Sequence, residues 1–339
     1  MSNLAPSPIS ARPTSPVIAC ISSSSSACAV AKVAAELARQ SARPLILFHT
    51  VEDRTSLGHL PDPIASHLDR NRMRTFLVEL QHDILLQGAQ LAINIAIHDG
   101  CWQAELSSIV ARNPGADVVV GSSHHTENGH IAGTLVEAGV DHVVFVPDTE
   151  AFSATGPVRN RILVPHDGSS FAEAALAQAI GLAAASGAEL LLAHAIPASG
   201  IEEFGPPVIG DLELRKLIDR RNEDAACEFL EARLRQIRAH GIDVRSRCLK
   251  GDPRTRLSRL VAEERPSIVI LSARGAGVKT CENLVVGSTA TYLLDTLGTP
   301  TMLIASAAAP RSGAAWAIHN RQSLQLAREP LNRPPVPAA

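Results

Sequence analysis

The chain has 339 residues, a length typical of two domains rather than one. Lys and Arg number 31 against 34 Asp and Glu, so the formal net charge is −3, which excludes a global basic field that would attract nucleic acid or an anionic membrane. Aromatic residues make up 3% of the chain, so few rings are left to stack exposed bases.

The N-terminus and the cysteines bear on localisation. Met1 to Pro16 lacks a charged segment followed by an apolar one, which is not typical of a secretory signal. The uncharged run Ala174 to Ala188 is interrupted by two glycines and is shorter than the roughly 20 residues that span a bilayer. The six cysteines form no CxxC pair and no zinc-type spacing, and we interpret them as buried thiols. We therefore expect a cytoplasmic protein that does not contact a membrane.

Short apolar runs alternate with longer segments of helical period in the first half, a pattern typical of βαβ units and a parallel sheet. The predicted strands are Val17–Ile21, Leu45–Val51, Leu91–Ile97, Asp117–Gly121 and His142–Val146. The predicted helices are Ala27–Gln40, Pro63–Gln87, Trp102–Arg112 and a short one around Thr134–Ala138.

The second half repeats this order. The predicted strands are Arg161–Pro165, Glu189–Ile196, Ile242–Leu249, Ser267–Ser272 and Thr299–Ala305. The predicted helices are Phe171–Ser186, Asp211–His240, Arg254–Glu264 and Ser288–Leu297. Ser170 and Glu173 have the spacing of a capping box, and Gly241 stands where a left-handed residue would end a helix. The repetition indicates an α/β protein of two tandem Rossmann-like domains, each a five-stranded parallel sheet with helices on both faces.

A ligand of such a sheet binds beyond the carboxyl ends of strands, where the strand order reverses. With the first strand central, this geometry selects the turn His166–Ser170 and the segment Ala273–Gly287. Glycines let a backbone approach a phosphate, and the helix predicted to begin at Ser288 offers free N–H groups. Arg274 and Lys279 would add positive charge there. Alternatively, the glycines only shape a surface loop and Ser288 only caps its helix.

Two common nucleotide motifs do not fit this segment. The run Gly275-Ala276-Gly277-Val278-Lys279-Thr280 lacks the GK[ST] of a Walker loop and the third glycine of a dinucleotide fingerprint. A P-loop NTPase and a nicotinamide-dependent dehydrogenase are therefore not supported.

The run Arg161 to Ser169, with Asp167 in its turn, resembles the opening strand of the universal stress protein family. The pattern Ser272-x2-Gly275 followed by Gly287-Ser288 is similar to that family's G-x2-G-x9-G-[S/T] loop, although Ser272 replaces the first glycine and eleven residues separate Gly275 from Gly287. The resemblance covers roughly Val158 to Ala305 and extends to Val17–Val146 only as a pattern of strands and helices.

The resemblance implies a tandem universal stress protein with adenine nucleotide alpha hydrolase-like domains. Its expected parts are a disordered N-terminus (1–15), a degenerate domain (16–148), a linker (149–158), a domain with the nucleotide loop (159–306) and a disordered tail (307–339). It also implies ATP as the ligand, with Mg²⁺ as a further expectation. The expected contacts are Pro165, Asp167, Ala195, Ser272, Arg274, Gly275, Gly277, Gly287, Ser288 and Thr289.

The first half departs from this pattern. Ser22 falls where Asp167 falls, and no Gly-Ser pair follows Gly121, so we predict that this half does not bind ATP and replaces the second subunit of a dimer. The resemblance implies that Val143–Val146 and Thr301–Ile304 pair, and a homodimer of tandems is a further expectation. His124, His125 and His130 with Glu127 are either a metal site or, as we favour, an exposed loop rich in histidine. We interpret His49 and His194 as packed, hydrogen-bonded histidines.

We predict a stress-response protein that binds an adenine nucleotide in its second half and acts as a switch toward a protein partner. We assign no catalytic residue and no metal ligand, and we expect a binding protein rather than an enzyme. The alternatives are a nucleotide-independent interaction protein with a vestigial site and a weak ATPase that uses Asp167 and Lys279. Acidic residues interleave with the basic stretches of the long second-half helix, which favours a solvated face over a nucleic-acid groove.

Overall fold

The computed structural model describes residues 15–22, 26–51, 63–86, 91–122, 128–147, 159–197, 209–276 and 285–305. The predicted terminal segments and linker lie almost wholly outside these ranges. The strands of the first half are β1 (Val17–Cys20), β2 (Leu45–Val51), β3 (Ile93–Asp99), β4 (Asp117–Ser122) and β5 (His142–Pro147). Its helices are α1 (Ala27–Gln40), α2 (Pro63–Leu86), α3 (Trp102–Arg112) and α4 (Asn128–Glu137).

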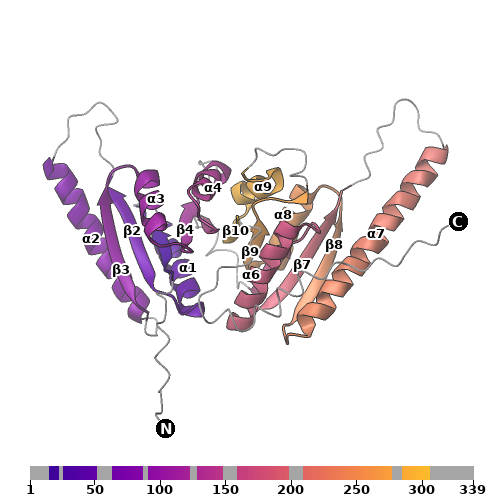
Figure 1. Cartoon of the computed structure of the whole chain (residues 1–339), viewed down its shortest axis with the longest axis horizontal. Coiled ribbons are helices and arrows are strands. Elements are labelled where there is room, and N and C mark those ends of the chain that lie inside the picture. The colour runs from indigo at the N-terminus through magenta and orange to yellow at the C-terminus, as the bar shows by residue number, and fades with distance from the viewer. Residues whose placement is uncertain are drawn as a thin grey trace, which may run out of the picture.

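The second half follows the same order of elements (Figure 1). Its strands are β6 (Arg159–Pro165), β7 (Glu189–Ile196), β8 (Val244–Lys250), β9 (Pro266–Ser272) and β10 (Thr301–Ile304). Its helices are α6 (Ser170–Ser186), α7 (Ile209–Arg238), α8 (Pro253–Glu264) and α9 (Ser288–Thr296). Most predicted boundaries agree within two residues, but α4 begins at Asn128, ahead of the short helix predicted around Thr134.

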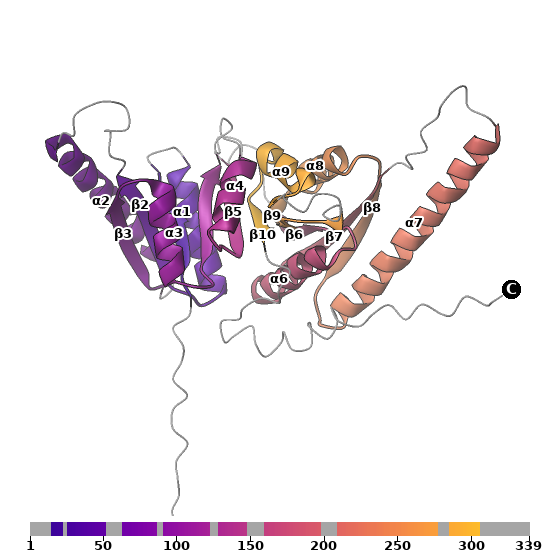
Figure 2. The same ribbon diagram turned by 45° about the horizontal axis from the view of Figure 1, so that its top comes forward.

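All ten strands form one sheet in the order β3-β2-β1-β4-β5-β10-β9-β6-β7-β8. The strands are parallel within each half, and the antiparallel pair β5–β10 joins the halves, with Thr301 opposite Phe145 and Ile304 opposite His142. Figure 2 shows these two strands side by side at the centre of the molecule. The predicted fold class is confirmed, and so are the central first strand and the pairing of the fifth strands.

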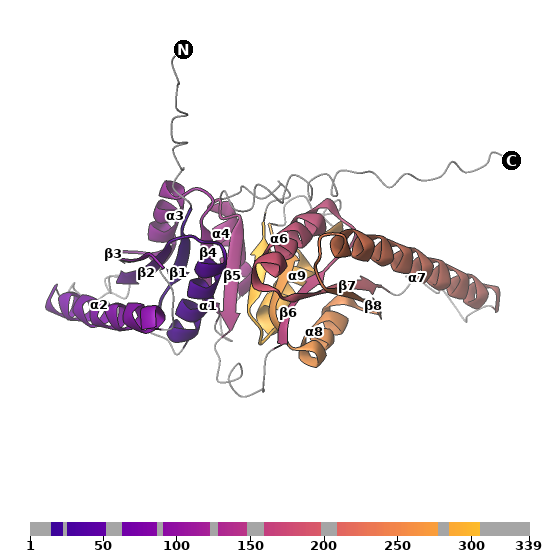
Figure 3. The same cartoon turned by 90° about the horizontal axis from the view of Figure 1, so that it is seen from below.

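Helices cover both sides of the strands in each half (Figure 3). Because successive strand side chains point to opposite faces, Val17 and Ala19 contact one buried cluster and Ile18 contacts the other. The first cluster includes residues of α1, α2, α6 and α7, and the second includes residues of α3, α4, α8 and α9. Each cluster contains residues of both halves, so on each face of the sheet the buried core continues from one half into the other.

Local sequence explains where several helices begin and end. Ser169, rather than Ser170, caps α6: its hydroxyl accepts a hydrogen bond from the Ala172 amide at 3.2 Å, so the predicted capping box at Ser170 and Glu173 is wrong. Asp252 caps α8 in the same way, accepting from the Thr255 amide at 3.0 Å. Gly241 follows α7 with a φ of 75°, which confirms its predicted left-handed conformation.

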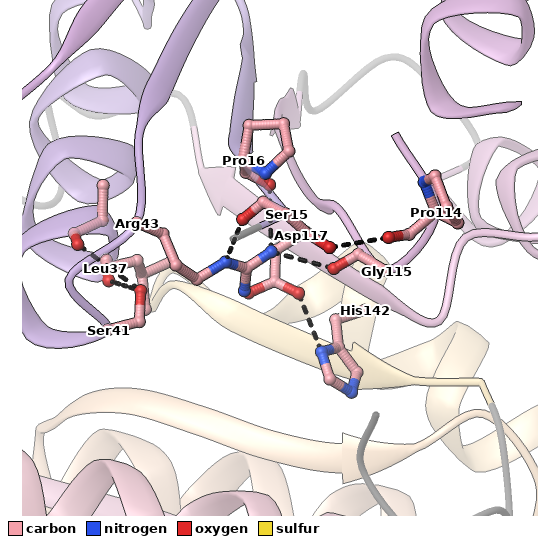
Figure 4. Close-up of polar contacts among 10 residues, drawn as sticks. Ser15, Pro16, Leu37, Ser41, Arg43, Pro114, Gly115, Asp117 and His142 are labelled. Atoms are coloured by element: carbon pink, nitrogen blue, oxygen red, sulfur yellow. Dashed lines mark hydrogen bonds and ion pairs between the residues drawn. The ribbon is translucent and has the colours of Figure 1, made fainter. Parts of the chain in front are cut away.

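A buried ionic cluster lies at the amino end of β4, at the opposite edge of the sheet from the carboxyl ends. Figure 4 shows Arg43 reaching Asp117, with Nη1 at 2.5 Å from Oδ2, and His142 Nδ1 at 2.8 Å from the other carboxylate oxygen. The same guanidinium donates to the carbonyl oxygens of Ser15, Pro16 and Gly115. Arg43 therefore ties the start of β1 to the start of β4.

Candidate functional site

The reversal of strand order in the second half lies between β6 and β9, where a doubly wound sheet opens a crevice for ligands. The turn after β6 carries Asp167, and the residues after β9 carry Arg274 and Gly275. The start of α9 completes this edge. All three segments belong to the sequence-predicted site.

Asp167 is held by main-chain donors from two segments. Its Oδ1 accepts from the Ser169 amide at 3.0 Å, and its Oδ2 accepts from the Ala276 amide at 2.7 Å. Burial by itself raises the pKa of this carboxyl, but the hydrogen bonds from Ser169 and Ala276 outweigh burial and lower the pKa below its ordinary value. Asp167 is therefore a carboxylate at neutral pH and ties the turn after β6 to the loop after β9.

Gly275 packs directly on this carboxylate. A Cβ atom at this position would lie 2.4 Å from Asp167 Oδ2, so any side chain would displace the loop or the carboxylate. The loop therefore requires a residue without a Cβ atom at this position, which is one of the glycines in the sequence pattern.

The loop after β9 is also tied to α9. The Gly287 amide donates to the Ala273 carbonyl oxygen at 2.7 Å, and Gly287 occupies the cap position without a side-chain hydrogen bond to the helix. The amides of the first turn, including those of Ser288 and Thr289, have no acceptor inside the helix and lie at the positive end of its dipole. This arrangement suits an anion.

Arg274 supplies a second feature that suits an anion. Its Nε is buried and has no hydrogen-bond partner among the described residues. An unpartnered guanidinium nitrogen inside a protein is costly, and a phosphate oxygen is an acceptor that would satisfy it.

Three other predicted contacts lie on the neighbouring strand ends. Pro165 is the last residue of β6 and pairs with Ala193, so Ala195 lies two residues beyond the stretch of β7 that pairs with β6. Ser272 ends β9 opposite Ile304. Gly277 and Lys279 lie outside the described residues. Two hydrogen bonds hold these segments together: the Ala276 amide donates to the Asp167 carboxylate, and the Gly287 amide donates to the Ala273 carbonyl oxygen. Arg274 and Gly275 lie in the loop between these contacts.

A cluster around the buried His166, which the sequence analysis did not assign, supports the Asp167 turn. His166 Nδ1 accepts from the Gly168 amide at 3.0 Å, and Nε2 lies 3.3 Å from Glu173 Oε1. Arg233 Nη2 holds the same Glu173 oxygen at 2.5 Å, and the Phe229 ring lies 5.1 Å from the imidazole. Phe229 and Arg233 are four residues apart on α7, a spacing that puts both on one helix face and could have revealed them.

Each half makes an equivalent hydrogen bond at this edge. His194 Nδ1 lies 2.7 Å from the His166 carbonyl oxygen, and His49 Nδ1 lies 2.7 Å from the Ile21 carbonyl oxygen, with a sequence separation of 28 in each case. Both histidines are hydrogen-bonded, as interpreted. The match places Ser22 where the second half has Asp167, and Thr50 where it has Ala195.

Two other sequence interpretations have different outcomes. His124, His125 and Glu127 lie outside the described residues, His130 is exposed on α4, and no group of three potential metal-binding side chains occurs within the described ranges. The interpretation of the cysteines as buried is wrong for Cys28, Cys101, Cys227 and Cys248, which are exposed, because each lies on an outward position of a helix, strand or turn.

The sheet order and the site at its reversal define a Rossmann-like α/β protein with a candidate anion-binding crevice. Residues 159–305 match the model of the universal stress protein family. No curated protein sequence matches the chain. No helix in the described ranges combines the length and apolar character needed to cross a membrane.

Solved structures extend the fold to both halves. A universal stress protein from Archaeoglobus fulgidus has 16% identity and a TM-score of 0.59, covering 86% of this chain and 96% of that one. A putative universal stress protein from Pseudomonas aeruginosa has 16% identity and a TM-score of 0.52, covering 93% and 98%. Another match, to a universal stress protein in complex with cAMP, has 21% identity and a TM-score of 0.28, covering 44% and 98%. At these identities, the first two show the fold of the whole chain and nothing further.

Proposed function

We propose that the chain is a stress-response protein whose second half binds an adenine nucleotide, ATP with Mg²⁺, at the crevice between β6 and β9. Two observations carry this proposal: the buried Arg274 Nε has no hydrogen-bond partner among the described residues, and α9 begins without a side-chain cap. Both features offer donors to phosphate oxygens, and Asp167 offers a carboxylate to a ribose hydroxyl or an adenine amine. Mg²⁺ arrives bound to the phosphates.

The proposed switch uses the hydrogen bond between Asp167 Oδ2 and the Ala276 amide. In the bound state the nucleotide takes the place of the Ala276 amide at this oxygen, so occupancy changes the loop that follows β9. A loop with two conformations of different ligand affinity presents a different surface to a protein partner in each. In this proposal the chain is a binding protein and the halves are two domains, 16–148 and 159–306, with the first replacing a second subunit.

Titration calorimetry on the full chain tests nucleotide binding, with ATP, ADP, AMP, cAMP and adenosine in the presence of Mg²⁺. We expect one site per chain and affinity that rises with the number of phosphates. Arg274→Gln should weaken ATP binding at least tenfold and adenosine binding little. Asp167→Asn should weaken both.

Ser22→Ala is the matched control for Asp167→Asn, because Ser22 occupies the equivalent position of the first half, and it should leave the affinity for ATP unchanged. Absence of binding at millimolar ATP would overturn the proposal and favour an interaction protein with a vestigial site. Phosphate release that disappears in Asp167→Asn and Lys279→Gln would instead indicate a slow ATPase.

A further inference from the structure

The first half contains a cavity of about 900 Å³ at the carboxyl ends of its central strands. This volume lies within the range of sites that bind small molecules. The lining residues come from β1, β2 and β4 and from three helices, α2, α3 and α4. The cavity occupies the same place in the first half as the candidate nucleotide crevice in the second, since His49 and His194 make matching hydrogen bonds beside the two.

The walls of this cavity are rich in aromatic rings. Phe48, Phe76 and Trp102 line it together with Met73 and Val51. The whole chain has only seven Phe, two Trp and one Tyr, so this concentration is high for the composition. Aromatic walls bind a flat aromatic ring by stacked or edge-to-face contacts, and a methionine sulfur adds a favourable contact with a ring.

The polar groups of the cavity do not suit a phosphate. Ser22 stands where the second half has the Asp167 carboxylate. The guanidinium of Arg72 lies 3.9 Å from Asp69 on the same helix, and its side chain is 81% exposed, so its charge is shared with a carboxylate and faces water. Among the described lining residues, a nucleotide would find no counterpart of the Asp167 carboxylate and no arginine nitrogen that is buried like Arg274 Nε.

One lining residue selects for a hydrogen-bond donor. A carbonyl oxygen only accepts, so His49 Nδ1 must carry the proton in its contact with Ile21. In the neutral imidazole, Nε2 is then an acceptor. Thr50, the next residue of β2, also lines the cavity.

We propose that this cavity is a second ligand site, which binds an uncharged aromatic molecule with one hydroxyl or amine donor and does not bind nucleotides. The rings of Phe76 and Trp102 hold the aromatic body, and His49 Nε2 accepts from the donor. The site does not depend on nucleotide binding by the second half.

A fluorescent arylamine, N-phenyl-1-naphthylamine, tests the site on the full chain. The Trp316→Phe background leaves Trp102 as the only tryptophan. We expect saturable binding of one probe per chain, energy transfer from Trp102 to the probe, and no displacement by excess Mg-ATP. Unsaturable binding, absence of transfer from Trp102, or displacement by ATP would each overturn the proposal.

Two variants on α2 locate the probe. Met73→Asp places a carboxylate in the cavity wall and should weaken probe binding at least tenfold. Val78→Asp makes the same change at a position on this helix that is 48% exposed, and should leave the affinity unchanged. If Met73→Asp and Val78→Asp both keep the circular dichroism of the unchanged chain and bind the probe equally well, the probe does not bind in this cavity. If Met73→Asp does not fold, the Trp102 transfer signal in the Trp316→Phe background decides the question.

Discussion

Gly129 on α4 lies directly against Thr291 on α9, at the junction between the two halves: a Cβ atom on Gly129 would lie 2.4 Å from Thr291 Cγ2. In the same contact, Asn128 Nδ2 donates to the Leu294 carbonyl oxygen at 3.0 Å. The close approach of these helices covers one face of the sheet where β5 pairs with β10. The junction is thus a packed interior and not only a pair of strands.

We expect Gly129→Ala to lower the free energy of unfolding by about 1–3 kcal/mol, the usual cost of an overpacked core. Thr291 is β-branched in a helix and cannot rotate away freely. Urea unfolding measures the change. Thr291→Ala in the same chain should restore most of the loss.

Gly133→Ala is the control for this change, because it lies on the same helix with no atom within 4 Å of its added Cβ. It should be neutral or slightly stabilising, as expected for alanine in a helix. Equal stabilities of the two alanine variants would show that α4 and α9 do not pack as described.

Asp117 should make the stability of the chain depend on pH at acid values. Burial raises the pKa of this carboxyl, but His142 and Arg43 together outweigh burial and lower the pKa below its ordinary value. The folded pKa is thus below the unfolded one, so the stabilisation is complete above the unfolded value of about 3.9 and is lost as pH falls through the folded pKa. Urea unfolding between pH 3 and pH 7 should show this decline.

Asp117→Asn should make that decline shallower, with Asp167 still contributing to it. It should also cost about 3 kcal/mol or more at pH 7, because it leaves the Arg43 charge buried without its partner. Asp99→Asn is the control. Asp99 also pairs with an arginine, Arg70, but its side chain is 70% exposed, and loss of this pair should cost at most about 1 kcal/mol. A cost for Asp117→Asn as small as that of the control would contradict the buried network.

Gly275→Ala should separate Asp167 from the loop after β9, because the added Cβ would lie 2.4 Å from Oδ2. The Ala276 amide then loses its acceptor, and its hydrogen–deuterium exchange should accelerate. Mass spectrometry of a peptide that contains Ala276 measures the rate. Gly298→Ala, with no atom within 4 Å of its Cβ, should leave that rate unchanged. Unchanged exchange in Gly275→Ala would exclude the close packing of Gly275 on Asp167.

Cysteine reactivity should follow exposure. Burial raises the pKa of the Cys20 thiol to about 12. Each unit of pKa lowers the thiolate fraction about tenfold, so Cys20 should react with iodoacetamide at pH 8 at least about ten times more slowly than Cys28 or Cys101, which are exposed. Peptide mapping by mass spectrometry after timed quenching gives the rates. Labelling of Cys20 as fast as Cys28 would show that the end of β1 is open to solvent.

The sequence by itself determined the order and nearly all the boundaries of the strands and helices, because apolar periodicity and capping residues act over a few neighbouring residues. It also predicted that the loops carrying Asp167, Gly275 and Gly287 meet at one edge of the sheet, because the strand order of a doubly wound sheet fixes which loops lie together. Local patterns were less reliable for caps: Ser169 and Ser170 satisfy similar rules, and only the geometry of the turn selected Ser169.

Only the tertiary structure decided which side chains share a site. The Ala276 amide donates to Asp167, which is 109 positions earlier in the sequence. Arg233 and Phe229 of α7 pack around His166, with Arg233 contacting Glu173 and Phe229 contacting the imidazole. The cavity of the first half is lined by residues of six elements. The sequence does not predict that Phe48, Phe76 and Trp102 line the same cavity, because they lie on three different elements. Sequence periodicity places each residue on a face, whereas contacts between distant segments depend on how the completed layers pack.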